Sequence, residues 1–355
     1  MTAPSIKFGE LEIQPSTILA PMEGVTDRPF RRLIRKLGGC GLTVTEFISS
    51  EQLTRASKKA WKQAEFDADE HPVSIQIYGR DPDRLADAAA ACEDYGADAI
   101  DLNFGCPSKQ VTSGCSGSAL MREPELASRI FRAVRQAIKI PLSVKMRLGW
   151  DDDQRNAPDI AIRAEAEGVQ MVTVHGRTRC QMYRGRADWG AIRQVTEAVS
   201  IPVIVNGDVL TAKDALDAMD QSGAHGVMVG RGILRDPWLL RKIADTLRGD
   251  VPFEPTLNQR CEHLKSYFDI LRKDTHTEKA AVGRIKKAMG FFTRGLPYGI
   301  ALRETVYHLH QVEPIYDSID AYFQRLENES MRTEFNRIHL GDTPDPRRDD
   351  RSLHR

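Results

Sequence analysis

Short runs of apolar and β-branched residues recur along the first 230 residues of the chain, and amphipathic stretches lie between most of them. The starts of successive runs are about 23 to 43 residues apart, which suits a strand followed by the helix that returns the chain. Continuous apolar runs are typical of parallel strands that are buried on both faces. We therefore predict eight parallel strands, at residues 17–20, 42–45, 73–77, 99–102, 142–145, 171–174, 203–205 and 226–229.

Eight strand and helix units predict an α/β fold of the (β/α)8 TIM-barrel type. Proline is favoured in the first turn of a helix. Helix starts are therefore expected at Asp81-Pro82, Glu123-Pro124 and Asp236-Pro237.

The pattern changes after Gly249, where Pro252 and Pro255 indicate a linker. Helical periodicity then continues to about residue 338. The last residues are polar, charged and proline-containing, a composition that favours disorder. We expect a barrel over residues 1–249, a small C-terminal helical bundle over residues 250–340 and a disordered tail over residues 341–355.

Residues with functional groups stand at the end of every predicted strand. Barrel active sites are built at the C-terminal ends of the strands, so these residues are expected to share one rim. Any single one of them could be an ordinary polar loop residue, whereas the whole set favours a functional site. The set comprises Pro21, Met22, Glu46, Gln76, Asn103, Cys106, Lys145, Arg147, His175, Arg177, Asn206, Asp208, Gly230 and Arg231.

Two glycine-containing turns follow the last two strands, Asn206-Gly207-Asp208 and Gly230-Arg231-Gly232. Barrels commonly bind phosphate at this place, where backbone N–H groups converge. Glycine lets the backbone approach the phosphate closely, and Arg231 adds charge. The two turns together predict the phosphate site of flavin mononucleotide (FMN).

The flavin ring requires further groups. A cation stabilises the negative charge that reduced FMN carries near N1 and the C2 carbonyl, and Lys145 is the candidate for it. Gln76 and, as a weaker candidate, His175 can hydrogen-bond the pyrimidine edge. Pro21, Met22 and Glu23 are expected to form the wall beside the ring.

The composition excludes several classes of protein. No apolar run approaches the roughly 20 residues that cross a bilayer, and the N-terminus lacks the pattern of a secretory signal. We expect a cytoplasmic protein without a membrane partner.

The six cysteines form no CxxC pair, so no metal site is expected. The chain has no G-x-G-x-x-G motif between a strand and a helix, so a nicotinamide is expected to visit the flavin rather than to occupy a fixed Rossmann site. The net charge of zero gives no support for an RNA partner.

The segment from Asp101 to Lys109 (DLNFGCPSK) is similar to the signature of tRNA-dihydrouridine synthases, and the chain resembles the bacterial B-type branch most. Five other segments resemble this family in its order and spacing, and the resemblance covers about residues 10 to 335. These segments are residues 20–27, 145–150, 175–178, 206–208 and 230–231.

The resemblance implies FMN in the barrel, NADPH as the electron donor, and a uridine of the tRNA D-loop as the substrate. It also implies that the helical domain helps to grip the tRNA. The positions that match FMN-contacting residues are Pro21, Met22, Glu23, Gln76, Lys145, Asn206, Gly207, Asp208, Gly230 and Arg231. Four residues fall in motifs that line the uracil and phosphate side of the pocket, namely Asn103, Arg147, His175 and Arg177. We assign Asn103, Arg147 and Arg177 to substrate binding.

Cys106 matches the catalytic proton donor of the family. A hydride from flavin N5 to uracil C6 leaves negative charge on C5 and the C4 carbonyl, and an acid must protonate C5. A thiol is mostly protonated at neutral pH, so Cys106 can be this acid. Cys115, nine residues further on in a glycine-rich loop, is the rival donor.

Two clusters of basic residues could contact RNA, although a run of charge is more often only a solvated face. Turning a base out of the tRNA into the pocket costs free energy that backbone contacts must supply. One cluster, after the sixth strand, consists of Arg177, Arg179, Arg184 and Arg186 around Tyr183, and the other consists of Arg284, Lys286, Lys287 and Arg294.

Two other functions remain open from the sequence. One is a small-molecule flavin reductase that resembles dihydroorotate dehydrogenase, and the other is a non-catalytic tRNA-binding protein that retains FMN. The helical second domain and the arginine-rich loop favour the enzyme acting on tRNA, because a small metabolite needs neither. One barrel for each tRNA favours a monomer.

Overall fold

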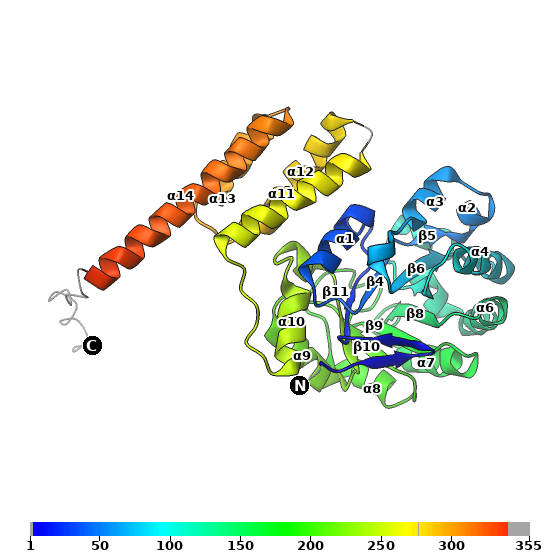
Figure 1. Cartoon of the computed structure of the whole chain (residues 1–355). Helices are drawn as coiled ribbons and strands as arrows, with labels where there is room; N and C mark the ends of the chain where they lie inside the picture. Colours follow the sequence, from blue (N-terminus) through cyan, green and yellow to red (C-terminus); the bar gives the residue numbers. More distant parts are fainter. Residues whose placement is uncertain (1–2, 276, 340–355) are drawn as a thin grey trace, which may run out of the picture. The chain divides into compact units, whose positions relative to one another are not determined.

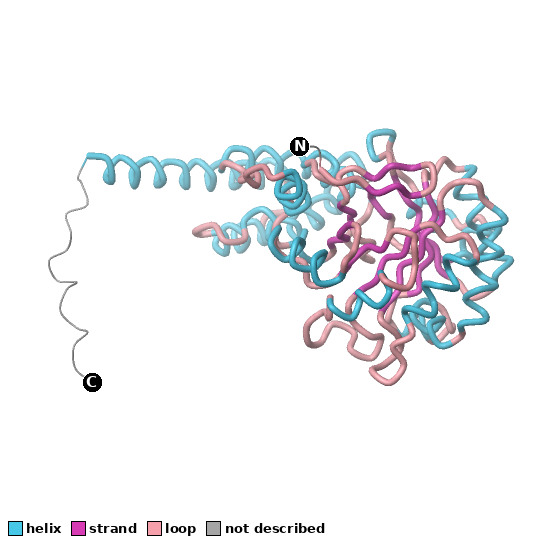
Figure 2. The backbone as a smooth tube through the Cα atoms, turned by 90° about the horizontal axis from the view of Figure 1, so that it is seen from below, coloured by secondary structure: helices cyan, strands magenta, loops and turns pink. Residues whose placement is uncertain are grey.

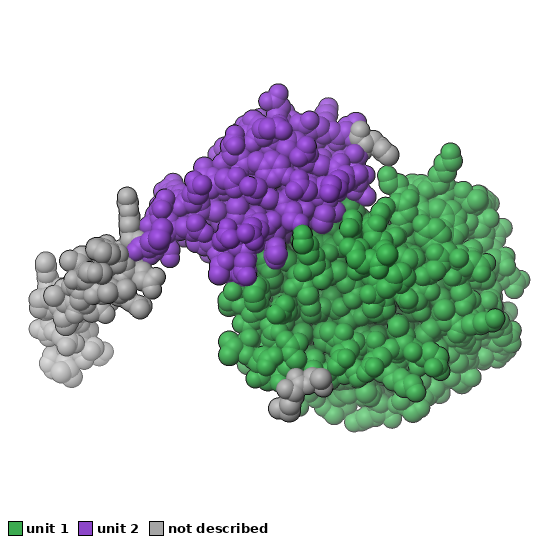
Figure 3. Space-filling view, in the orientation of Figure 1, with its two compact units in different colours: residues 1–254 green, residues 255–355 purple. Residues whose placement is uncertain are grey.

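The computed structural model describes residues 3–275 and 277–339, and it divides the chain into two compact units, residues 1–254 and 255–355 (Figures 1 and 3). The tail expected over residues 341–355 lies outside the described residues. No helix in the described ranges is both long enough and apolar enough to span a bilayer.

Unit 1 is a closed barrel of eight parallel strands, as the hydrophobic pattern predicted. The strands follow one another around the barrel, and β4 pairs with β6 as well as with β3, which closes the ring. Figure 2 shows the strands inside a layer of helices. The barrel strands are β3 (Thr17–Leu19), β4 (Leu42–Val44), β6 (Val73–Tyr78), β7 (Ala99–Phe104), β8 (Leu142–Arg147), β9 (Met171–His175), β10 (Val203–Asn206) and β11 (Gly226–Val229).

All eight strands begin where the sequence placed them, but several end one or two residues later. Asn103, Arg147, His175 and Asn206 therefore lie in the last residues of the barrel strands rather than in the following loops, and Lys145 lies within β8 as predicted. Side chains of a strand alternate between two faces, so this difference decides which groups point into the barrel.

The outer layer consists of helices whose starts follow local capping rules. Pro82 and Pro124 stand in the first turns of their helices as predicted, and Asp81 accepts hydrogen bonds from the backbone of Asp83 and Arg84. The helix expected at Asp236-Pro237 begins later, at Leu239. The helices are α1 (Arg28–Leu37), α2 (Ser50–Thr54), α3 (Lys58–Ala64), α4 (Pro82–Asp94), α5 (Lys109–Thr112), α6 (Pro124–Ala137), α7 (Ala157–Ala166), α8 (Arg193–Thr196), α9 (Ala212–Ser222) and α10 (Leu239–Arg248), with short 3₁₀ turns at Ala68–Glu70, Gly117–Arg122, Gly190–Ile192 and Arg231–Leu234.

A small hairpin of β1 (Ile6–Phe8) and β2 (Leu11–Ile13) closes the end of the barrel at which the strands begin. Ile6, Phe8 and Ile13 are buried in one apolar cluster with residues from the starts of barrel strands. A Cβ on Gly226 would lie 2.5 Å from Ile6 Cδ1, so glycine is required for this close approach. In the described part of the chain, the hairpin covers this end of the barrel, so the opposite end is the place to look for a site.

Within the described residues, unit 2 contains four helices, which confirms the bundle predicted from the helical periodicity. Thr256 caps the first helix by accepting a hydrogen bond from the backbone of Gln259, and Thr277 caps the second in the same way. The helices of unit 2 are α11 (Leu257–Asp274), α12 (Glu278–Thr293), α13 (Gly299–His308) and α14 (Val312–His339). Unit 1 also contains a short strand, β5 (Ile48–Ser49), which pairs with β6.

A buried ion pair ties α1 to the turn before β6. Arg31 Nε lies 2.8 Å from Glu70 Oε2, and both side chains are fully buried. The same guanidinium donates hydrogen bonds to the backbone oxygens of Thr26 and Glu65. Removing one partner of such a pair leaves the other as an uncompensated buried charge.

We expect Arg31→Met to lower the free energy of unfolding by about 3 to 5 kcal/mol, because Glu70 loses its cationic partner in the pair. The change is measured as a shift of the urea midpoint. Arg55→Met is the matched control, because Arg55 pairs with Glu51 on the surface and should lose far less. Equal shifts for the two variants would contradict a stabilising role for the buried pair.

Candidate active site

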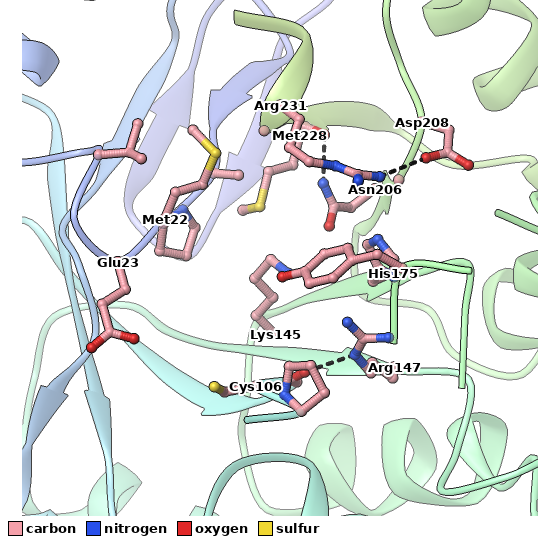
Figure 4. A pocket seen from close by; sticks show the side chains of 18 of the residues that line it. Met22, Glu23, Cys106, Lys145, Arg147, His175, Asn206, Asp208, Met228 and Arg231 are labelled. Atoms are coloured by element: carbon pink, nitrogen blue, oxygen red, sulfur yellow. Dashed lines mark hydrogen bonds and ion pairs between the residues drawn. The ribbon is translucent and has the colours of Figure 1, made fainter. Parts of the chain in front are cut away.

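A cavity of ≈ 440 Å³ opens at the C-terminal ends of the barrel strands. Figure 4 shows Met22 and Glu23 on one side, Arg147 and His175 on the other, and Lys145 between them. Every residue predicted to act in catalysis or to contact the cofactor or the substrate lines this cavity except Gln76 and Arg177, and Glu46 of the predicted rim also lies outside its lining. The predicted residues that line it are Pro21, Met22, Glu23, Asn103, Cys106, Lys145, Arg147, His175, Asn206, Gly207, Asp208, Gly230 and Arg231.

The loop after β3 forms one wall of the cavity and is held by its own hydrogen bonds. Thr26 Oγ1 accepts a 2.8 Å bond from the backbone N–H of Met22. Glu46, at the end of the next strand, accepts from the backbone N–H of Gly24. Burial raises the pKa of the Glu46 carboxyl. These bonds fix the backbone that carries Met22 and Glu23.

The turns after β10 and β11 supply a corner built of backbone. Gly207 has a φ of 114°, and a Cβ there would lie 2.9 Å from Ala187 Cβ and 3.2 Å from His175 Nε2. A Cβ on Gly230 would lie 3.5 Å from Met22 Sδ. Side chains at these two positions would fill the corner, so the glycines keep it open for a bound group.

Asp208 orients the cations of this corner. Its carboxylate accepts bonds of 3.0 and 2.5 Å from Arg177, a 3.0 Å bond from Arg231 and a 2.8 Å bond from the Ala187 N–H. Burial alone would raise the pKa of Asp208, but the hydrogen bonds and charges of these partners lower it. The carboxylate of Asp208 is thus an anion that positions Arg231, and a phosphate would be better placed at the backbone of this turn than at the carboxylate.

Tyr183 lies between two arginines at the mouth of the cavity. The guanidinium carbons of Arg231 and Arg147 lie 4.8 and 5.6 Å from the centre of its ring. The ring is half exposed and lines the cavity. The sequence suggested only an RNA contact for Tyr183, because its loop position did not reveal that it reaches the pocket.

Lys145 brings a positive charge to the cavity floor. Burial, followed by repulsion from Arg147, lowers its pKa to about 8, while Asp101 and Cys106 act in the opposite direction. The ammonium group is therefore still mostly charged at pH 7. Among the described residues, none accepts a hydrogen bond from Nζ. The group is free to bind an anionic ligand.

His175 is neutral at pH 7. Burial lowers its pKa well below the usual value, and the charges of Arg147, Lys145, Arg177 and Arg231 lower it further. Its Nδ1 is buried without a hydrogen-bond partner in the described part of the chain. A buried polar atom of this kind is normally paired, so a ligand in the cavity is the expected partner.

Arg147 is mostly committed to the protein. Its Nε donates to Gly105 O, and its Nη1 donates to the backbone oxygens of Thr178 and Met182. Burial lowers its pKa to about 10, so it stays cationic at neutral pH. No bond from Nη2 occurs within the described residues, so this amino group can serve the cavity.

Cys106 stands in the turn after β7. Its Sγ lies 3.3 Å from Ser108 Oγ, and its backbone N–H donates a 2.9 Å bond to Asn103 Oδ1. The backbone oxygen of Cys106 accepts from both the N–H and the hydroxyl of Ser118. The turn is thus held from both sides. Cys115, the rival donor, does not line the cavity.

Two predicted site residues lie outside the lining of the cavity. Gln76 is fully buried inside the barrel, within β6, and its amide is bonded to Asp101 and Asn103. Arg177 is also buried, and its guanidinium is held by Asp208 and by the backbone oxygens of Arg184 and Gly185. The sequence predicted direct ligand contacts for both, whereas the structure gives them partners within the protein.

The residues present fit a flavin. The unpartnered Nδ1 of His175 and the free ammonium of Lys145 are suited to the polar edge of the ring, and Met22 offers an apolar wall. The two glycine turns with Arg231 suit a phosphate. The cavity is also within the usual size of cofactor sites.

The chain is similar in sequence to proteins of one family over most of its length. The dihydrouridine synthase (Dus) family model matches residues 18–327. The chain is 43% identical over 325 residues to a probable tRNA-dihydrouridine synthase of Rickettsia bellii (strain RML369-C), which covers 91% of this chain and 99% of that protein. It is 38% identical over 302 residues to tRNA-dihydrouridine synthase B of Xanthomonas axonopodis pv. citri (strain 306), with 85% and 90% of the two chains covered. Among solved structures it is similar to morphinone reductase in complex with tetrahydroNAD, with a TM-score of 0.48 and 13% identity over 72% of this chain and 92% of that one.

Proposed function

The chain belongs to the dihydrouridine synthase family, and from this we propose that it reduces the C5–C6 double bond of uridines in the tRNA D-loop, with FMN as its flavin and NADPH as the electron donor. It is an oxidoreductase, as are its named relatives. The observation that carries the proposal is the meeting of the Cys106 thiol and the Lys145 ammonium in one cavity with the two glycine turns. The cytoplasm, where tRNA is found, is the proposed location.

The FMN site would use residues of five strand ends. Arg231 and the backbone of the turns at Gly207 and Gly230 would hold the phosphate. Lys145 and His175 would hold the polar edge of the ring. Met22 with its neighbours Pro21 and Glu23 would form the wall, and Asn206, whose Nδ2 donates to Met228 O, would keep the β10 end in place.

Bound in its reduced form, FMN would supply the hydride that goes to C6 of the uracil ring. Cys106 then donates the thiol proton to C5, and its thiolate takes up a proton from solvent afterwards. Ser108 can turn its hydroxyl toward the thiolate and donate to it. The free amino group of Arg147 can donate to a ring carbonyl and stabilise the negative charge that develops there, and Asn103 keeps the Cys106 turn in place.

Gln76 and Arg177 remain part of the proposed site in supporting roles. Gln76 accepts a 2.7 Å hydrogen bond from Asn103 Nδ2, and Arg177 clamps Asp208 and the loop that carries Tyr183. Both therefore orient residues that line the cavity.

Unit 2 is proposed to bind the tRNA. The four basic residues of its predicted cluster differ in whether they have partners within the protein. Arg284 is paired with Asp274 at 2.8 Å, and Lys286 donates to Tyr307 O. Lys287 and Arg294 are exposed, and the described residues provide neither with an ion-pair partner. Lys287 and Arg294 are therefore better suited to phosphate contacts than Arg284 and Lys286.

Lys145→Met is expected to weaken FMN binding at pH 7 by about tenfold, since it removes one charge contact worth roughly 1.4 kcal/mol. In the parent protein, affinity should also fall as the pH rises above about 8, because Lys145 then loses its proton. The variant should lack this decline. Quenching of flavin fluorescence at several pH values measures both effects.

Lys139→Met is the control, because Lys139 is exposed and remote from the cavity lining. A colourless parent protein that takes up no FMN would refute the cofactor. The same pH dependence in the parent and in Lys145→Met would refute the role of the lysine.

Cys106→Ala should separate the two half-reactions, because the thiol acts only after the hydride transfer. Reduction of the flavin by NADPH should stay near the parental rate. Formation of dihydrouridine should fall by about 10² to 10⁴, the usual contribution of a positioned general acid. Stopped-flow absorbance follows the flavin, and mass spectrometry of tRNA digests follows the product.

Cys115→Ala is the matched control and should cost far less, because Cys115 does not line the cavity. If the losses were exchanged between the two variants, Cys115 would be the donor. If orotate rather than tRNA reoxidised the flavin, the chain would be a small-molecule reductase.

Replacing Lys287 and Arg294 with alanine should weaken tRNA binding and reduce the slope of log K against log salt by about 1 for each phosphate that the protein no longer neutralises. Reduction of the flavin by NADPH should not change. Lys7→Ala is the control, since Lys7 is exposed on the hairpin at the end of the barrel opposite the cavity. An unaltered affinity and slope in the double variant would mean that this face of unit 2 does not bind tRNA.

A further inference from the structure

Asp101 is a buried carboxylate to which the proposed reaction assigns no task. It lies in β7 with only 2% of its surface exposed, and it does not line the cavity. Asn103, two residues further along the same strand, does line the cavity. Residues two apart on a strand share a face, so both side chains are on the same side of β7.

A chain of hydrogen bonds runs from Asp101 to the Cys106 turn. Asp101 Oδ2 accepts a 2.5 Å bond from Gln76 Nε2. Gln76 Oε1 accepts a 2.7 Å bond from Asn103 Nδ2. Asn103 Oδ1 in turn accepts bonds of 3.1 and 2.9 Å from the backbone N–H groups of Gly105 and Cys106.

The direction of this chain is determined at both ends. Backbone N–H groups can only donate, so they require the oxygen of Asn103 on their side. Asn103 then presents its NH₂ group to Gln76, and Gln76 presents its own NH₂ group to residue 101. A carboxylate oxygen accepts there without competition, so Asp101 is the acidic end that completes the sequence of donors and acceptors.

The second oxygen of Asp101 has a separate partner. Ser143 Oγ lies 2.6 Å from Oδ1. Burial raises the pKa of Asp101, whereas the hydrogen bonds from Gln76 and Ser143 and the charge of Lys145 lower it. The serine hydroxyl can donate or accept, so Oδ2 accepts from Gln76 in either protonation state of the acid.

We propose that Asp101 is a positioning residue that acts through Gln76 and Asn103 to hold the turn bearing Cys106, and so sets where the thiol lies. The role of the thiol as proton donor rests on the proposed function, whereas the hydrogen bonds that hold its turn do not. Breaking the chain at Asp101 leaves two amides free to rotate. The Cys106 turn then loses the acceptor that holds two of its N–H groups.

The test compares variants that remove the acceptor at residue 101, its charge alone, or its second partner. Asp101→Leu removes the acceptor at similar volume, Asp101→Asn retains a carbonyl acceptor, and Ser143→Ala removes only the second partner. The first measurement is the rate at which iodoacetamide alkylates Cys106 and Cys115 in the full-length protein, resolved by mass spectrometry. The second is single-turnover reoxidation of the reduced holoenzyme by tRNA.

Asp101→Leu should change the alkylation rate of Cys106 by about threefold or more while leaving that of Cys115 near the parental value, because reactivity follows the surroundings of each thiol. Reoxidation by tRNA should slow by about tenfold to a hundredfold, since a small misplacement of a reacting group has an effect of this size. Reduction by NADPH should change much less. Asp101→Asn and Ser143→Ala should stay close to the parent in every measurement.

Several results would overturn the proposal. If Asp101→Leu kept the parental alkylation rate of Cys106 and the parental rate of reoxidation by tRNA, the chain of hydrogen bonds would not position the thiol. Equal losses in Asp101→Asn and Asp101→Leu would show that charge matters and the acceptor does not. Changes of equal size at Cys106 and Cys115 would indicate general loosening of the barrel.

If Asp101→Leu does not fold, Gln76→Leu interrupts the same series of hydrogen bonds one residue nearer the Cys106 turn. The same two measurements on that variant then test the proposal. If the parent enzyme itself is not reoxidised by tRNA, the proposed function fails. The alkylation rates still test the positioning in that case, because they require no turnover.

Discussion

The hydrogen bonds that close the barrel between β4 and β6 are the constraint on which the site depends. Closure brings the C-terminal ends of all eight strands to one rim, so residues far apart in the chain share one cavity. Cys106 from β7, Lys145 from β8 and the glycine turns after β10 and β11 meet only for this reason. The hairpin of β1 and β2 fills the other end, which leaves a single open mouth at this rim.

Within that rim the balance of charge suits an anionic cofactor. Lys145 and Arg147 are held in a buried position that lowers the pKa of each, and His175 is kept neutral among them. Asp208 is committed to orienting Arg177 and Arg231. Burial disfavours the charged form of Lys145, the charge of Asp101 opposes this effect, and a bound phosphate or an electron-rich ring would favour the charged form further. The proposed mechanism assigns the ring to these groups and the proton to Cys106.

The sequence was sufficient for the barrel because its strands are apolar runs bounded by helix-start signals, and both patterns are local. It was also sufficient for most of the cavity, because each residue stands at a strand end. Nothing local in the sequence reveals the protein partners of Gln76 and Arg177, because Asp101, Asn103 and Asp208 lie on other strands or loops. Asp101 was passed over because its partners lie on β6 and β8, and only the register between strands reveals them.

In the proposed reaction, hydride and proton both leave this one cavity for a uridine in tRNA. The most direct test is to reduce the purified protein with one equivalent of NADPH in the absence of oxygen, add an unmodified tRNA transcript, and count flavin reoxidised against dihydrouridine formed. We expect one dihydrouridine for each flavin reoxidised, all of it in the D-loop. Reoxidation without dihydrouridine, or reduced flavin that persists in the presence of tRNA, would contradict the proposed reaction.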